Sequence, residues 1–420
     1  MTGPDFAAGA SFRTVPDDGE PLRILVVGAG RMARLWLRTI LACPDTTLAG
    51  VVDTDPGAAE KALAETGAPE VPTGRDLTAL AAATSPHAVV DVTVPAAHLP
   101  VTLEALALGL PVLGEKPLAA TLPEALRLAA AASVAGELFM VSQSRRYHPH
   151  LFALKEQAGR LGRLGILTTE FFKAPRFGGF RDEMDHPLLL DMAIHPFDTA
   201  RWLLDAEPVS VRCEEYNPGW SWYAGDAATT AVFEMSGGSR YVFTGSWCSP
   251  GLETSWNGAW RLSGEHGSIT WDGGGHPAEV ETPAAEADPP RSTAAPMKGI
   301  AGSLAEFVHA LRTGAVPMGE VHDNVMSLAM VTGAVESART DRRVSIDDLL
   351  NTALTEAHAQ ATGPERDLLR ERPGDIDDLL DTTLAEARAQ ATGPERDLLR
   401  GRPGDVVRAP AAGPPPAGRP

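Results

Sequence analysis

The feature that most constrains this 420-residue chain is an apolar run that ends in glycines, at residues 22–33. The letters LRILVVGAGRMA join a run typical of a buried parallel strand to the pattern G-x-G-x-x-A, formed by Gly28, Gly30 and Ala33. The residues after Gly30 have helical spacing, so the segment predicts a strand, a tight turn and a helix. This order favours a site for the pyrophosphate of a dinucleotide over an ordinary turn. Gly28 would permit the turn, Gly30 the close approach of the phosphates, and Ala33 close helix–strand packing.

A second short apolar run, which ends in an acid, supports the dinucleotide interpretation. It covers residues 48–53, LAGVVD, and places Asp53 about 20 residues after the glycine pattern, as the motif requires. A carboxylate there accepts hydrogen bonds from the ribose hydroxyls and repels a 2′-phosphate. The alternative, a solvated acid in a turn, fits Asp55 better because Asp55 precedes Pro56. We therefore expect NAD as the cofactor, with NADP as the less favoured choice.

The composition argues against several classes of function. A formal net charge of −19 disfavours nucleic acid or an anionic membrane surface as the main partner. No apolar run approaches the roughly 20 residues of a transmembrane helix, and residues 1–20 lack the pattern of a signal peptide. Cys43, Cys213 and Cys248 are odd in number and have no metal-ligand spacing. We expect a cytoplasmic protein with free thiols and no metal.

Strands and helices alternate from residue 21 onward, which predicts an α/β fold class. The pattern is typical of a doubly wound parallel sheet, which we assign to residues 21–144, after a flexible leader at 1–20. The strand at 87–94 ends at a proline, and loops after the carboxyl ends of such strands line the cofactor crevice. The residues placed near the nucleotide on this ground are Thr93, Val94 and Pro95.

Two pairs of β-prone segments indicate an antiparallel sheet in the second half of the chain. Segments 229–235 and 239–247 are separated by Ser-Gly-Gly, which is a hairpin signal. Segments 259–262 and 268–271 form a second pair with a glycine between them. We place the second domain at residues 145–347.

The segment LLLDMAIHPFD, residues 188–198, is the candidate for catalysis. In a regular helix Asp191, His195 and Asp198 would share one face. Acids and an imidazole inside an apolar run are costly unless they are paired or used. A buried histidine paired with a neighbouring aspartate is the alternative. Pro196 has no backbone N–H, so the helix is expected to kink or to begin there.

The sequence resembles the glucose–fructose oxidoreductase and inositol dehydrogenase family, also written Gfo/Idh/MocA, over residues 22–347. The motifs that carry the resemblance are Gly28-x-Gly30-x-x-Ala33, Asp53, Glu115-Lys116-Pro117 and Arg146-Tyr147-x-Pro149. The resemblance implies a Rossmann domain and a C-terminal α+β domain with a large, mostly antiparallel sheet, through which homo-oligomers often form. Asp191 and His195 match the family's Asp-x-x-x-His element. Asp185-His186-Pro187 departs from it, because many relatives have glycines there.

These residues together indicate an NAD-dependent oxidoreductase that acts on a secondary alcohol of a sugar, cyclitol or sugar derivative. His195 would be the general base, Asp191 would hold the substrate hydroxyl or the imidazole, and Lys116 would donate to the reacting oxygen. Arg146 and Tyr147 would bind substrate or form a wall of the site. A ketosugar or sugar-nucleotide reductase is an alternative. A catalytically silent, ligand-binding regulator is another, which the full set of three catalytic residues disfavours.

The expected cofactor contacts come from four loops. They are Gly28, Gly30, Arg31, Met32, Ala33, Asp53, Thr93, Val94, Pro95, Glu115 and Lys116. Glu115 is expected to orient Lys116 rather than to react.

The end of the chain, 348–420, departs from the family pattern. Residues 346–375 and 376–405 are near-identical 30-residue copies, and a Pro/Ala/Gly-rich end follows that is expected to be disordered. A recent duplication without function is the preferred interpretation, and an interaction appendage is the alternative.

Overall fold

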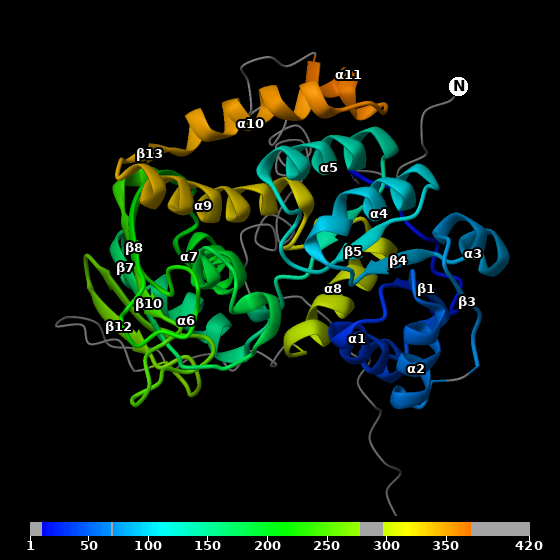
Figure 1. Ribbon diagram of the computed structural model, residues 1–420, viewed down its shortest axis with the longest axis horizontal. Helices are drawn as coiled ribbons and strands as arrows, with labels where there is room; N and C mark the ends of the chain where they lie inside the picture. Colours follow the sequence, from blue (N-terminus) through cyan, green and yellow to red (C-terminus); the bar gives the residue numbers. More distant parts are fainter. Residues whose placement is uncertain (1–10, 69, 278–296, 371–420) are drawn as a thin grey trace, which may run out of the picture.

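The computed structural model describes residues 11–68, 70–277 and 297–370 and contains two sheets (Figure 1). The first sheet has six parallel strands in the order β3-β2-β1-β4-β5-β6, which confirms the predicted doubly wound domain. Its strands are β1 Leu22–Val27, β2 Thr46–Val52, β3 Thr73–Gly74, β4 Ala88–Asp91, β5 Val112–Gly114 and β6 Phe139–Val141. Its helices are α1 Arg31–Ala42, α2 Pro56–Thr66, α3 Leu77–Thr84, α4 Pro95–Ala107 and α5 Leu122–Ala135.

Apolar continuity and end signals account for these elements. β1 and β4 are almost wholly buried, as strands covered by helices on both faces must be. Asp55, Asp76 and Thr121 accept backbone hydrogen bonds as the N-caps of α2, α3 and α5. The strand order reverses between β1 and β4, so their carboxyl ends form the crevice where such sheets bind ligands.

The second sheet has seven strands in the order β12-β11-β7-β10-β9-β8-β13. Only β7 and β10 pair in parallel, and both predicted hairpins, β9–β10 and β11–β12, are confirmed. The strands are β7 Leu164–Phe172, β8 Pro208–Tyr216, β9 Ala228–Met235, β10 Arg240–Ser246, β11 Ala259–Gly264, β12 Gly267–Trp271 and β13 Val344–Ser345. The remaining helices are α6 Pro149–Ala158, α7 Ile194–Leu204, α8 Gly299–Thr313, α9 Val321–Thr340, α10 Ile346–Gln360 and α11 Glu365–Arg370, with the short turns η1 Ser144–Arg146, η2 Gly179–Arg181, η3 Leu189–Ala193 and η4 Ser236–Gly238.

Helix α8 returns to the first domain although it follows six of the seven strands of the second sheet in sequence (Figure 1). Its buried Leu304, Phe307 and Leu311 share one apolar core with Trp36 and Leu37 of α1. Sequence order had placed this segment in the second domain. The burial of apolar surface against α1 sets its position instead.

Part of the predicted leader also packs on the first domain. Phe12 is only 4% exposed, and the backbone N–H of Val15 donates to the carbonyl of Leu311 at 2.8 Å. Residues 12–15 are therefore held by packing and hydrogen bonds and are not free of the domain. Residues 1–10 lie outside the described part of the chain.

The start of the predicted tail is an integral part of the fold. α10 and α11 lie over α5, and α10 also contacts α9 (Figure 1). Ile346, Leu350, Leu354 and Leu369 are each at most 4% exposed. The first repeat copy is thus not an appendage, because its apolar stripe completes the core between the two domains. The second copy, 376–405, lies outside the described residues.

Among the helices that the structure describes, none combines the length and the apolar character that crossing a membrane requires.

Candidate active site

The glycine turn between β1 and α1 has the shape that a pyrophosphate needs. Gly28 has φ +99°, and a Cβ on it would lie 2.9 Å from the backbone of Val92, so a side chain is excluded there. At Gly30, the N-cap of α1, a Cβ would meet no atom within 4 Å, which leaves room for phosphate oxygens. Ala33 is fully buried. The turn therefore fits a dinucleotide at the helix N-terminus.

The other predicted cofactor residues lie at the same edge of the sheet. Asp53 directly follows β2, and its Oδ2 accepts a hydrogen bond of 2.7 Å from the N–H of Ala29. Within the same turn, Arg31 is exposed and Met32 is half-buried. The loop after β4 holds Thr93, Val94 and Pro95, of which Val94 is 67% exposed. The expected positions of these residues are thus compatible with one bound nucleotide.

Glu115 is a buried support and not an open contact residue. Its Oε1 accepts a 2.8 Å hydrogen bond from the indole of Trp36, and its Oε2 accepts from the N–H of Lys116 at 3.2 Å. Burial raises the pKa of Glu115, against the opposing effects of Trp36 and Lys116. The ring nitrogens of His98 lie near the carbonyls of Pro117 and Thr93, at 2.8 and 3.2 Å. Glu115 and His98 therefore fix the backbone that carries Lys116.

Lys116 and Asp191 meet across the two domains. The Nζ of Lys116 donates to the Asp191 carbonyl at 2.7 Å and to its Oδ1 at 3.1 Å. The other carboxylate oxygen accepts from Arg181 of η2 at 2.7 Å. Burial favours the neutral acid, but Lys116 and Arg181 together hold the pKa of Asp191 below its ordinary value. Arg181 lies ten residues before Asp191, in a segment that carries no recognisable motif, and the sequence prediction missed it.

His195 is 8% exposed and lies close enough to Lys116 and Arg145 for their charges to act on its ring. Its Nδ1 has no hydrogen-bond partner among the described residues. Burial lowers the pKa of His195 well below 6.5, and the nearby cations Arg145 and Lys116 lower it further. The imidazole is therefore neutral at pH 7 and can accept a proton.

A π-turn at Leu189–Ala193 precedes α7 and alters the predicted helical face. Pro196 lacks the N–H that a regular helix would direct at the carbonyl of Met192, and a wider turn accommodates the missing bond. The prediction placed the change in the helix at Pro196, and the structure places it two residues earlier, where α7 begins at Ile194. Asp198 does not join Asp191 and His195, because its carboxylate accepts from Arg146 at 2.6 and 2.8 Å.

Arg146 and Tyr147, predicted to bind substrate or to form its wall, have structural contacts instead. Arg146 is buried, pairs with Asp198 and Asp323, and donates to the carbonyl of Met318. The hydroxyl of buried Tyr147 donates to Glu306 of α8. These side chains join elements of both domains. The substrate-binding interpretation of this pair is therefore not supported by their contacts.

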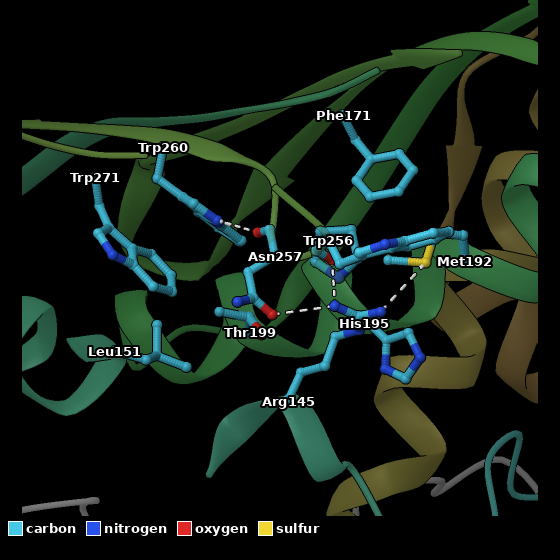
Figure 2. A pocket seen from close by; sticks show the side chains of 11 residues that line it. Arg145, Leu151, Phe171, Met192, His195, Thr199, Trp256, Asn257, Trp260 and Trp271 are labelled. Carbon is cyan, nitrogen blue, oxygen red and sulfur yellow. Dashed lines mark hydrogen bonds between the residues drawn. The ribbon is translucent and has the colours of Figure 1, made fainter. Parts of the chain in front are cut away.

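The residue before this pair, Arg145, does face the site (Figure 2). It lines a small hollow together with His195. The walls are mostly apolar, and their apolar residues are Leu151, Phe171, Met192, Pro196, Trp256, Trp260 and Trp271. Besides Arg145 and His195, the polar lining residues are Asn257 and Thr199. Sequence reasoning did not single out Arg145, because a run of two arginines does not indicate which one faces a site.

Two family models match the chain. One, described as "Oxidoreductase family, NAD-binding Rossmann fold", matches residues 22–143, and "GFO/IDH/MocA C-terminal domain" matches residues 156–270. Together they cover more than half of the chain. The chain belongs to the Gfo/Idh/MocA family. It is thus an NAD-binding oxidoreductase of that family, which confirms the resemblance and the predicted fold class.

Individual relatives in the family are distant. The chain is 36% identical over 197 residues to inositol 2-dehydrogenase 4 of Saccharopolyspora erythraea, covering 46% of this chain and 57% of that protein. It is 28% identical to the rhizopine catabolism protein MocA of Rhizobium meliloti over 330 residues, covering 76% and 96%. A solved oxidoreductase from Agrobacterium radiobacter, in complex with NAD⁺, L-tartaric acid and magnesium, has a TM-score of 0.68 at 20% identity and covers 78% and 99%. That structural likeness shows the shared fold.

Proposed function

We propose that this chain is an NAD-dependent dehydrogenase that oxidises a secondary alcohol of a sugar, cyclitol or sugar derivative. The observation that carries the proposal is the meeting of Lys116 with Asp191 beside His195, a neutral imidazole whose Nδ1 is unpaired. The similarity to inositol 2-dehydrogenase 4 supports this substrate class. The preference for NAD over NADP rests on Asp53 at the end of β2.

Each residue has a defined role in the reaction. The bound nicotinamide supplies the hydride acceptor. His195 takes the proton of the substrate hydroxyl, which a neutral imidazole in a dry site can do. Lys116 donates a hydrogen bond to the same oxygen and so stabilises alkoxide character. Asp191 holds the ammonium of Lys116 in place and accepts a hydrogen bond from a neighbouring hydroxyl.

The same residues would serve ketone reduction, in which His195 returns a proton to the oxygen. Homo-oligomerisation through the C-terminal sheet and a cytoplasmic location remain predictions.

A panel of neutral and acidic sugars, polyols and inositols tests the proposal. Each compound is incubated with NAD and with NADP, and absorbance of the reduced cofactor is recorded. Turnover with NAD on at least one secondary alcohol, lost in Lys116→Met, is the expected result. A chain that binds NAD but oxidises none of the compounds would instead indicate the silent regulator.

A further inference from the structure

Arg145 carries a positive charge inside the hollow that no carboxylate among the described residues neutralises at ion-pair distance. Its guanidinium donates to the carbonyl of Trp256, to Oδ1 of Asn257 at 3.0 Å and to the sulfur of Met192 at 3.9 Å (Figure 2). All three partners are neutral. Burial lowers the pKa of Arg145 to about 10, and only the more distant charge of Asp191 opposes this. Arg145 is half-buried, and cations withdrawn from water are ordinarily paired, so this group lacks a counter-charge.

The charged residues around Arg145 do not supply the missing negative charge. Lys116 and Arg181 already share the carboxylate of Asp191, so three cations face one carboxylate in this part of the site. Arg146, one residue further along the chain, shows the contrast, because two carboxylates lie within 4 Å of its guanidinium. The two adjacent arginines therefore differ in kind. The charge of Arg146 is neutralised by carboxylates of the protein, whereas the charge of Arg145 is available to pair with an anionic group of a ligand.

We propose that Arg145 binds a carboxylate of the substrate, so that the natural substrates are sugar acids and not neutral polyols. This inference rests on the proposed function. The planar guanidinium fork matches the geometry of a carboxylate. The cofactor is not the source of the missing charge, because its phosphates are expected at the glycine turn of β1, whereas Arg145 follows β6 and faces His195.

Matched sugars test the carboxylate directly. D-glucose, D-glucuronate and D-glucose 6-phosphate differ only at carbon 6, and D-galactose with D-galacturonate forms a second pair. For each compound kcat/KM is measured with NAD. Binding is measured separately, by calorimetric titration of the same compounds into the chain with NADH, where no oxidation can occur. Arg145→Gln is compared with Arg212→Gln, which removes an equal charge from the exposed surface of β8.

The wild type and Arg212→Gln should prefer the carboxylate member of at least one pair. Arg145→Gln should lose about 10- to 100-fold for that compound, the worth of a charged hydrogen bond, and change little for its neutral partner. Three outcomes overturn the inference. They are an equal loss of activity in Arg145→Gln and Arg212→Gln, no preference for the carboxylate sugar in kcat/KM or in binding, and tighter binding of glucose 6-phosphate than of glucuronate. Oxidation of neutral sugars without carboxylate preference would overturn it and leave the proposed function standing. Binding of glucuronate through Arg145 without any oxidation would support the carboxylate site and contradict the proposed dehydrogenase function.

The repeated end of the chain carries a second, independent inference. Ser345 caps α10 by accepting from the N–H of Asp348, and Arg127 of α5 pairs with Glu365 at 3.2 Å. The side chains that fill the groove over α5 and α9 are Ile346, Leu350, Ala353, Leu354, Ala357, Ala361, Glu365 and Leu369. Adding 30 to each number gives the same residue in the second copy, except that Thr383 replaces Ala353.

We further propose that residues 376–399 of the same chain fill this groove when the first copy leaves it. In the sequence, Asp375 directly precedes the second copy as Ser345 directly precedes the first, and aspartate is an equally good N-cap residue. Only five of the 30 positions differ between the copies. Asn351, Thr355 and His358 are not buried in α10, Ala353 is buried, and position 371 lies outside the described residues. The first copy is favoured in the intact chain, since its use requires no loop to be closed.

Three deletions test the exchange, that is, whether the second copy can replace the first in the groove. Removal of 346–375 joins Ser345 to Ile376, removal of 376–405 keeps only the first copy, and removal of 346–405 leaves neither. Either single deletion should keep the melting temperature within about 5 °C of the full chain, and the double deletion should lower it by at least twice as much. Leu384→Asp should leave the melting temperature of the full chain unchanged and should lower that of the chain from which 346–375 has been removed.

A chain without 346–375 that is as unstable as one without both copies overturns the exchange. If the full-length Leu354→Asp variant forms a larger oligomer than the wild type on size exclusion, the second copy docks between chains, which contradicts docking within one chain.

Discussion

Lys116 and Asp191 are 75 positions apart in the chain, and their side chains meet at 3.1 Å between Nζ and Oδ1. One comes from the loop after β5 of the Rossmann domain, the other from the π-turn before α7. Both side chains are about one-fifth exposed, so the pair lies at the edge of the crevice and not in the core. The bond therefore aligns the two domains at the site while leaving the lysine accessible to a substrate oxygen.

If His195 accepts the substrate proton, His195→Ala should lower kcat by roughly 10²–10⁴-fold, the usual worth of general acid–base catalysis. NAD affinity should hardly change, because the predicted phosphate and ribose contacts lie on β1 and β2. Turnover and thermal melting are measured on one preparation. A folded variant that turns over at the wild-type rate would remove His195 from the mechanism.

The pH profile should reflect the lowered pKa of His195. A base with a depressed pKa is already unprotonated at pH 6.5, so kcat/KM for alcohol oxidation should fall only at a more acidic pH. Arg145 is one of the cations that lower this pKa, so Arg145→Gln should move the acid limb toward higher pH. An acid limb at pH 6.5 in the wild type, with no shift in the variant, would contradict this assignment.

Asp53→Ala should narrow the preference for NAD over NADP, because the carboxylate binds ribose hydroxyls and repels a 2′-phosphate. Loss of a charged hydrogen bond should weaken NAD binding by about tenfold or more. Titration of both cofactors measures the ratio. Asp55→Asn is the control: it removes an acid two residues away and preserves the N-cap of α2, so it should leave the ratio unchanged. If the wild type binds NADP more tightly than NAD, the assignment of NAD as the preferred cofactor is wrong.

Arg146→Ala should destabilise the chain and not weaken substrate binding selectively. Removing one partner of a buried ion pair costs about 3–5 kcal/mol, because Asp198 then stays buried without its main partner. Denaturant unfolding gives this loss, and KM at a temperature where the variant is folded gives the second measurement. A stable Arg146→Ala with a greatly raised KM would restore the original substrate-binding prediction.

How far the sequence could predict this site depends on how local each signal is. The glycine turn, Asp53 and the loop of Lys116 depend on backbone constraints within a few residues of a strand end, and all lie where they were expected. Asp191 and His195 were also recognised, although the helix that holds them is not regular. Pro196 removes a hydrogen bond and a π-turn precedes α7, while Asp198 pairs with Arg146 and does not join Asp191 and His195.

The sequence by itself thus determined the two-domain α/β fold, and it predicted the cofactor edge of the sheet and the candidate catalytic residues Lys116, Asp191 and His195. Only the tertiary structure decided which of two adjacent arginines faces the hollow. Neighbouring residues of a 3₁₀ turn point roughly 120° apart, and Asp198 and Asp323, far away in sequence, pair with Arg146. Arg145 consequently faces the hollow. Likewise, burial of apolar surface placed α8 on the first domain and turned the first repeat copy into part of the core, and no local pattern encodes such contacts.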